Sequence, residues 1–226
     1  MDQTGILILL MHLKTYHNKG ACQVDLAAKD KKHAYTVCVA TSADGDILPF
    51  QQIWSGKTKA SLPSASAPGY PEAIELGIKF TMASSSSHFS TLKTMKEWMT
   101  DILVPYIKLA IENNNLPTDQ KSILFIDCYP VHISQEFYSY ILEEHPNMFL
   151  IFVPANCTGI FQLADVGIQQ ILKHYLCQQT LNYLVASHKM QLASGLTPRQ
   201  VKFTTPLPML FLWGKASLNG LGKNVQ

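Results

Sequence analysis

Residues 122–153, SILFIDCYPVHISQEFYSYILEEHPNMFLIFV, decide the fold of this chain. Two compact apolar runs, residues 122–126 and 149–153, enclose residues 134–144, which we expect to form a helix. A strand, a crossover helix and a second strand predict a parallel pair with a right-handed connection. The stretch therefore indicates an α/β protein.

The residues before this stretch have a β-like pattern from residue 6 to residue 54. The apolar runs are residues 6–11, 23–27, 35–41 and 47–54. The segment ADGD at 43–46 separates the last two runs, and Asp-Gly is a strong hairpin signal because glycine accepts the positive φ of a tight turn. We expect an antiparallel meander here, followed by polar surface loops at 55–71 and 84–87.

Two further helices are expected outside the central stretch. Apolar residues recur at helical spacing from Leu92 to Ile107, behind a capping residue at Ser90 or Thr91, and Pro105 should kink or divide this helix. A last long helix begins near Asp165, and its apolar stripe should pack on the sheet. That stripe contains Ile168, Ile171, Leu172, Tyr175, Leu176 and Leu184. The order of elements predicts a mixed sheet flanked by helices, of which an RNase-H-like arrangement is one solution.

Composition limits the possible classes of protein. The 226 residues are 47% hydrophobic and 15% charged, which is enough to bury one substantial core. A net charge of +2 permits an anionic partner without requiring one. Five cysteines without a C-x-x-C pair argue against a disulfide framework and a zinc ribbon, and favour a reducing compartment. The run at 6–11 is too short to span a bilayer, so we expect an intracellular protein that is neither secreted nor membrane-bound.

Three aspartates are candidates for chemistry. Asp127 ends a buried parallel strand, where open α/β sheets place ligand sites, although a turn aspartate explains it equally well. Asp165 has an alternative role as a helix N-cap, and Asp2 as a solvated terminal acid. Taken together, they are the kind of carboxylates that two-metal phosphoryl transfer requires, converging on ions about 3.5–4 Å apart.

Four ordered blocks carry a resemblance to a known family. Residues 127–132 (DCYPVH) resemble D-N-A-P-S-H, and residues 161–168 (FQLADVGI) resemble L-Q-P-x-D-x-G-[VI]. Residues 152–158 (FVPANCT) are similar to F-L-P-P-N-T-T, and residues 1–5 (MDQTG) to M-D-E-T-G. These are motifs of the DDE-type transposase catalytic domain, in the pogo/jerky-like branch of the mariner-like transposases.

The resemblance implies an RNase-H-like endonuclease domain over residues 1–205, with 206–226 a divergent, frayed or disordered tail. It implies that Asp2, Asp127 and Asp165 bind Mg²⁺ or Mn²⁺ for phosphodiester cleavage and strand transfer on DNA, in the nucleus or another intracellular compartment. Further residues are candidates for contact with the substrate. They are His132, Gln162 and Lys57.

Departures from the family pattern keep an alternative open. The chain begins one residue before Asp2, so we expect an incomplete first strand that positions this acid poorly. Cys128 and Leu163 replace the Asn and Pro that are usual in the family, and a helix-turn-helix DNA-recognition module is absent from this chain. The alternative is a catalytically inactive or domesticated nucleic-acid-binding remnant of a transposase. A structural α/β protein without a DNA role is a third hypothesis.

Overall fold

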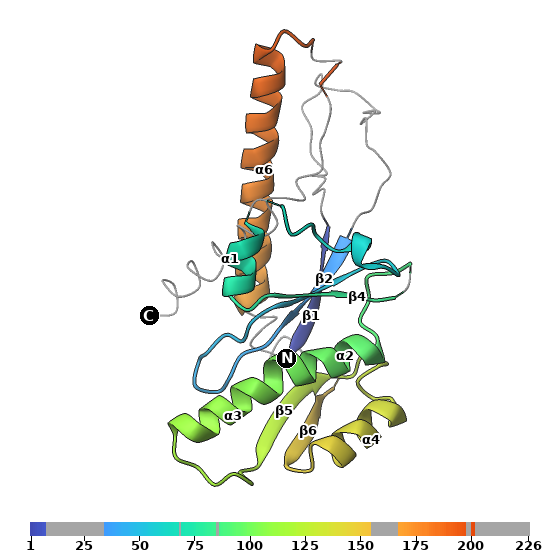
Figure 1. Cartoon of the computed structure of the whole chain (residues 1–226), viewed down its shortest axis with the longest axis vertical. Helices are drawn as coiled ribbons and strands as arrows, with labels where there is room; N and C mark the ends of the chain where they lie inside the picture. The colour runs from blue at the N-terminus through green and yellow to red at the C-terminus, as the bar shows by residue number, and fades with distance from the viewer. Residues whose placement is uncertain (8–33, 68, 85, 155–166, 198–199, 202–226) are drawn as a thin grey trace.

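The computed structural model describes residues 1–7, 34–67, 69–84, 86–154, 167–197 and 200–201 (Figure 1). The strands are β1 (Asp2–Leu7), β2 (Ala34–Val39), β3 (Gln51–Trp54), β4 (Lys79–Met82), β5 (Ser122–Asp127) and β6 (Met148–Val153). The helices are η1 (Lys59–Ser61), α1 (Tyr70–Glu75), α2 (Leu92–Trp98), η2 (Met99–Leu103), α3 (Val104–Asn113), α4 (Gln135–Glu144) and α6 (Gln169–Ala193). The mixture of strands and helices confirms the α/β class.

The strands form two sheets that lie end to end. One sheet has the order β1-β2-β3-β4, in which the first two pairings are antiparallel and the third is parallel. The other sheet is the parallel pair β5-β6, with Ile123 beside Phe149 and Asp127 beside Val153. The nitrogen of Met1 donates to the carbonyl oxygen of Phe125 at 2.8 Å, which brings the start of β1 against β5 (Figure 1).

Local sequence explains the elements that lie between these strands. Gly45 has φ +95° in the turn after β2, and Ser42 donates to the Asp46 carbonyl across it, so the Asp-Gly hairpin is confirmed. Thr91 caps α2 in a reciprocal pair with Thr94. Pro105 lies in the first turn of α3, directly after the π-helical turn η2, so the helix is divided as expected.

One core joins both sheets. It takes Cys38 and Ile53 from the four-stranded sheet and Ile126 from β5, and it packs them against Trp98 of α2 and Phe137 of α4. All five side chains are fully buried. A second cluster lies between the four-stranded sheet and the first turns of α6. It contains Ile6, Tyr35, Val37, Val39, Phe50, Trp54, Leu172 and Leu176.

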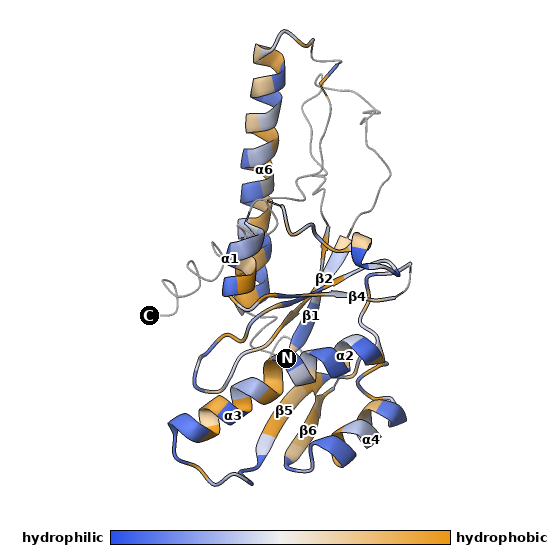
Figure 2. Cartoon of the chain, in the orientation of Figure 1, coloured by the Kyte–Doolittle hydropathy of each residue, from blue (hydrophilic) through white to orange (hydrophobic). Residues whose placement is uncertain are grey.

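The structure corrects three expectations about the fold. η1 and the first residues of α1 form helical turns within residues 55–71, which were expected to be a surface loop. β4 lies where no element was expected, and it pairs with β3 through its backbone. The stripe on α6 packs on the sheet mainly near its start: Leu172 and Leu176 are buried in the cluster with the sheet, whereas Leu184, further along the helix, is only partly buried. Figures 1 and 2 show α6 continuing beyond the sheet with hydrophobic and hydrophilic residues intermingled.

The third correction concerns the first strand. Asp2 is not poorly held, because it pairs with Val39 as the first residue of a six-residue strand and is only 5% exposed. The expected strand at 23–27 and the tail at 206–226 lie outside the described residues. None of the helices in the described ranges is long and apolar enough to cross a membrane.

Candidate functional site

Asp2 is held at the junction of the two sheets by hydrogen bonds. Its Oδ1 accepts from the backbone nitrogen of Gln3 at 2.7 Å, and its Oδ2 accepts from Nε2 of Gln169 at 2.5 Å. Gln169 is the first residue of α6 and is 4% exposed. A hydrogen bond therefore connects the Asp2 carboxylate on β1 to the first residue of α6.

Asp127 is held differently, by a residue of its own loop. It is the last residue of β5, and its Oδ1 lies 2.6 Å from Nδ1 of His132. The Asp127 side chain is 27% exposed, whereas that of His132 is completely buried. Its Oδ2 receives no hydrogen bond from the described residues.

The two aspartates act on the same neighbouring groups. Burial raises the pKa of the Cys38 thiol well above its usual range, and the negative charges of Asp2 and Asp127 raise it further. Burial lowers the pKa of the Met1 amino group, while the same two carboxylates oppose that change. The pKa of the Tyr129 phenol is also raised, mainly by burial and to a lesser extent by the negative charge of Asp127.

The sequence-predicted site residues are therefore brought together only in part. Asp2 and Asp127 both lie near Cys38 and the Met1 amino group, where the two sheets adjoin, whereas Asp165 and Gln162 lie outside the described residues. Lys57 is exposed in the loop after β3. It lies at the end of the sheet opposite Asp2, because Asp2 pairs with Val39 while Trp54 pairs with Tyr35.

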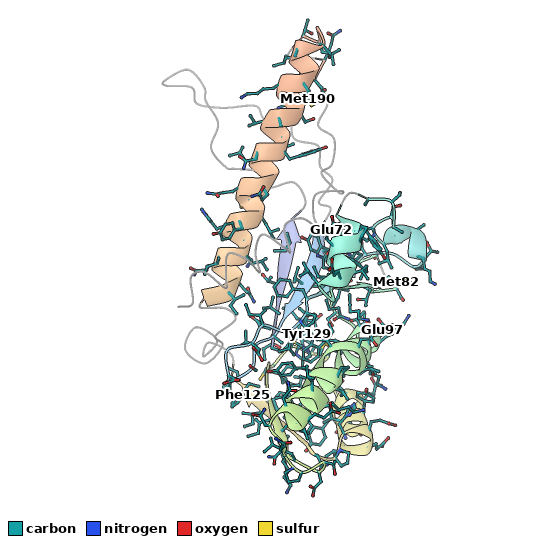
Figure 3. The ribbon with its side chains drawn as sticks, turned by 60° about the vertical axis from the view of Figure 1, so that its left-hand side comes forward. Glu72, Met82, Glu97, Phe125, Tyr129 and Met190 are labelled. Atoms are coloured by element: carbon teal, nitrogen blue, oxygen red, sulfur yellow. The ribbon has the colours of Figure 1, made fainter. Side chains whose placement is uncertain are left out.

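His132, a candidate for contact with a substrate, is fully buried in the described structure. Its ring has no exposed surface, and it packs against Tyr129 and Phe137. Nε2 of the ring lies 3.0 Å from Nε2 of Gln3, so both ring nitrogens face protein atoms. Tyr129, near the junction of the two sheets, marks this region in Figure 3.

Sequence reasoning missed two glutamines of the site, Gln3 and Gln169. Each is close to a predicted acid in the sequence: Gln3 follows Asp2 directly, and Gln169 comes four residues after Asp165. That spacing was the available signal, although it does not reveal which carboxylate each amide contacts. In the described part of the chain, no three or more His, Cys, Asp or Glu side chains form a group that could hold a metal ion.

The fold and the site define an α/β protein that carries two acidic side chains near the place where its two sheets adjoin. The family model of the DDE superfamily endonucleases matches residues 31–212, and the chain belongs to this family. The matched range contains Asp127 and Asp165 and begins after Asp2.

Part of the chain is similar in sequence to a mouse protein. The chain is 35% identical over 74 residues to the Jerky protein of Mus musculus. The aligned part makes up 33% of this chain and only 12% of the mouse protein. No solved structure matches the chain significantly.

Proposed function

We propose that this chain is a metal-dependent DNA strand-cleaving domain of the transposase type, in which Asp2, Asp127 and Asp165 hold Mg²⁺ or Mn²⁺. The observation that carries the proposal is that Asp2 and Asp127 both lie close enough to buried Cys38 for their charges to raise the pKa of its thiol. Membership of the DDE superfamily endonucleases supports the same chemistry. An antiparallel β1-β2-β3 followed by a parallel βαβ pair against β1 supports an RNase-H-like arrangement.

The described donors fit hard divalent cations in kind. Mg²⁺ and Mn²⁺ prefer carboxylate oxygens, and Asp127 presents Oδ2 without a protein donor among the described residues. Two neighbouring carboxylates at a partly buried site repel each other, and a cation relieves that repulsion. Asp165 lies four residues before Gln169, so chain connectivity keeps it within about 14 Å of the residue that binds Asp2.

The proposed roles of the residues follow from this arrangement. Bound divalent ions would supply Lewis-acid activation of water and of the scissile phosphate. Asp127 would bind through its exposed oxygen, and the Gln169 contact would keep Asp2 oriented towards the same site. Strand transfer would reuse the site with a DNA 3′-hydroxyl in place of water. Activity on DNA implies a nuclear or other intracellular location.

Nicking of supercoiled plasmid in Mn²⁺ or Mg²⁺ tests the proposal. We expect the unmodified chain to nick the plasmid, and Asp127→Asn and Asp165→Asn to lower the nicking rate by more than about a hundredfold. Loss of a residue that only supports a metal ligand through a hydrogen bond costs at most about a hundredfold, so a larger loss indicates a direct metal ligand. Asp44→Asn, on the exposed hairpin, is the matched control and should leave nicking unchanged. Nicking that persists in Asp127→Asn would rule out the mechanism.

The hydrogen bonds of Asp2 favour a second candidate function. Both of its carboxylate oxygens accept hydrogen bonds from neutral protein groups, as in a carboxylate with a structural role. This candidate is a nucleic-acid-binding protein that retains the fold without the cleavage. Salt-dependent DNA binding by the unmodified chain, without nicking in either metal, would support it over the first.

A further inference from the structure

We propose that His132 is a positioning residue, which orients the Asp127 carboxylate for cation binding and connects it to β1 through Gln3. The inference rests on the proposed function, since it assigns His132 a role at the same carboxylate site. It concerns how the site is held rather than which residues bind the ion.

The loop after β5 folds back to bring His132 to Asp127. The backbone nitrogens of His132 and Ile133 both donate to the carbonyl oxygen of Tyr129, at 2.8 and 3.2 Å. Ser134 then caps α4, since its hydroxyl accepts a hydrogen bond from the backbone nitrogen of Phe137. The turn and the helix cap together fix the backbone on both sides of the histidine.

The contact with Gln3 assigns the proton on the imidazole ring. Nε2 of Gln3 faces Nε2 of His132 at 3.0 Å, and an amide NH₂ group can only donate. Nε2 of His132 is therefore the acceptor, and the ring proton lies on Nδ1, from which it is donated to Oδ1 of Asp127 at 2.6 Å. A chain of hydrogen bonds runs from Gln3 to the carboxylate.

These hydrogen bonds link the two sheets at the site. Gln3 lies beside Asp2 on β1, whereas His132 follows β5, so the contact couples the strands that carry the two acids. Asp127 is partly exposed and ends its strand, so sheet packing alone leaves its side-chain rotamer free. With Oδ1 held by His132, Oδ2 is left in a fixed direction for a cation.

Binding of Mn²⁺ to the purified full chain, measured by electron paramagnetic resonance, tests the inference without relying on cleavage. His132→Asn places an amide N–H near the position of Nδ1, so it should keep the bond to Asp127 and bind Mn²⁺ within about threefold of the unmodified chain. His132→Gln extends its amide towards the position of Nε2, so it should lose that bond and weaken Mn²⁺ binding by about 10–100-fold. His145→Asn, whose ring contacts Tyr140 instead, is the matched control and should bind as the unmodified chain does.

Stability and affinity together separate a positioning role from a purely structural one. Both His132 variants disturb a buried site and should lower the thermal unfolding temperature, but only His132→Gln should lose Mn²⁺ affinity. Equal Mn²⁺ binding by the Asn and Gln variants would overturn the inference while leaving the proposed function intact. If the unmodified protein neither binds Mn²⁺ nor nicks DNA, both the inference and the proposed function are overturned.

A variant outside the loop covers the case in which the His132 variants do not fold. Gln3→Leu removes the donor to Nε2 while retaining both His132 and Asp127. We expect its Mn²⁺ affinity to fall by about tenfold, because the imidazole loses the contact that fixes its tautomer. Unchanged affinity in Gln3→Leu would overturn the role given to this hydrogen-bond chain.

Discussion

The four-stranded sheet and the β5-β6 pair each carry one aspartate of the site, but they are packed differently. β2 and β3 are buried along their whole length, so the middle of the sheet that holds Asp2 is covered on both faces. In β5, burial alternates: Leu124 and Ile126 are buried, while the residues of the opposite face are exposed. The exposed side chains of the pair are Ile123, Phe125, Phe149 and Ile151. Phe125 marks this face in Figure 3.

The difference shows how each carboxylate is oriented. Asp2 is almost fully buried, and hydrogen bonds from the backbone of Gln3 and from Gln169 hold its two carboxylate oxygens. Asp127 ends a strand with only one covered face, so its orientation depends on the specific bond from His132. Parallel strands are usually covered on both faces, which makes the exposed face of β5 and β6 an unusual feature of the described structure.

The largest contrast is expected in thiol chemistry. Cys38 lies in β2 and is fully buried, whereas Cys128 is exposed directly after β5. The thiolate is the reactive form, and a raised pKa means that Cys38 holds less thiolate at pH 8 than an ordinary thiol. We expect alkylation of Cys38 to be about a thousandfold slower than that of Cys128, measured by site-resolved mass spectrometry after short exposures.

A denatured sample is the control for this measurement. Both cysteines should react at similar rates once the chain is unfolded in urea, because burial and the charges of the site are then lost. Rapid labelling of Cys38 in the native protein would show that the four-stranded sheet opens readily, contrary to its packing.

A matched pair of isoleucines tests the packing of the two sheets directly. Ile53 of β3 is fully buried, and Ile123 of β5 is 58% exposed. We expect Ile53→Ala to lower the free energy of unfolding by about 2–5 kcal/mol, and Ile123→Ala to change it by less than about 0.5 kcal/mol. Urea denaturation measures both. A loss above 2 kcal/mol for Ile123→Ala would mean that this face is covered in solution, which would remove the contrast.

Local patterns in the sequence predicted a large part of the fold. The two apolar runs gave the parallel pair, Asp44-Gly45 gave the hairpin, and Thr91 gave a helix cap, because each depends on residues close in the chain. β4 was missed since its pairing with β3 joins Lys79 to Gln51, a contact that no local pattern reveals. Its edge position also leaves it without a fully buried face.

The site was predictable to a smaller extent. Motif blocks identified Asp2 and Asp127, and the structure places them near the same buried groups. The amides of Gln3 and Gln169 have no sequence signature, because neutral glutamines act here only through tertiary contacts. His132 likewise could not be assigned from sequence alone. The sequence shows that it is polar and close to Asp127 in the chain, and only the fold shows that its ring is buried and contacts the Asp127 carboxylate.

The smallest difference is expected between two glycines that follow β3 and β2, in how much an alanine substitution lowers the free energy of unfolding. Gly56 follows β3 with φ +134°, and a Cβ added there would lie 2.3 Å from the Cβ of Ser61. Gly45, in the hairpin after β2, has φ +95° but no heavy atom within 4 Å of such a Cβ. Gly45→Ala should therefore lower the free energy of unfolding by about 1 kcal/mol through backbone strain alone, and Gly56→Ala by about 2–3 kcal/mol.

A double variant separates the two contributions at Gly56. Rotation of the Ser61 hydroxyl cannot relieve a contact with Cβ, so Gly56→Ala must move the backbone of the loop that leaves the four-stranded sheet. Removing that side chain in Gly56→Ala/Ser61→Gly takes away the steric contact and leaves the strain from positive φ. Measured against Ser61→Gly, the loss from Gly56→Ala should then fall to about 1 kcal/mol, equal to that of Gly45→Ala. A loss that stays near 3 kcal/mol would show that the backbone, rather than Ser61, makes this position require glycine.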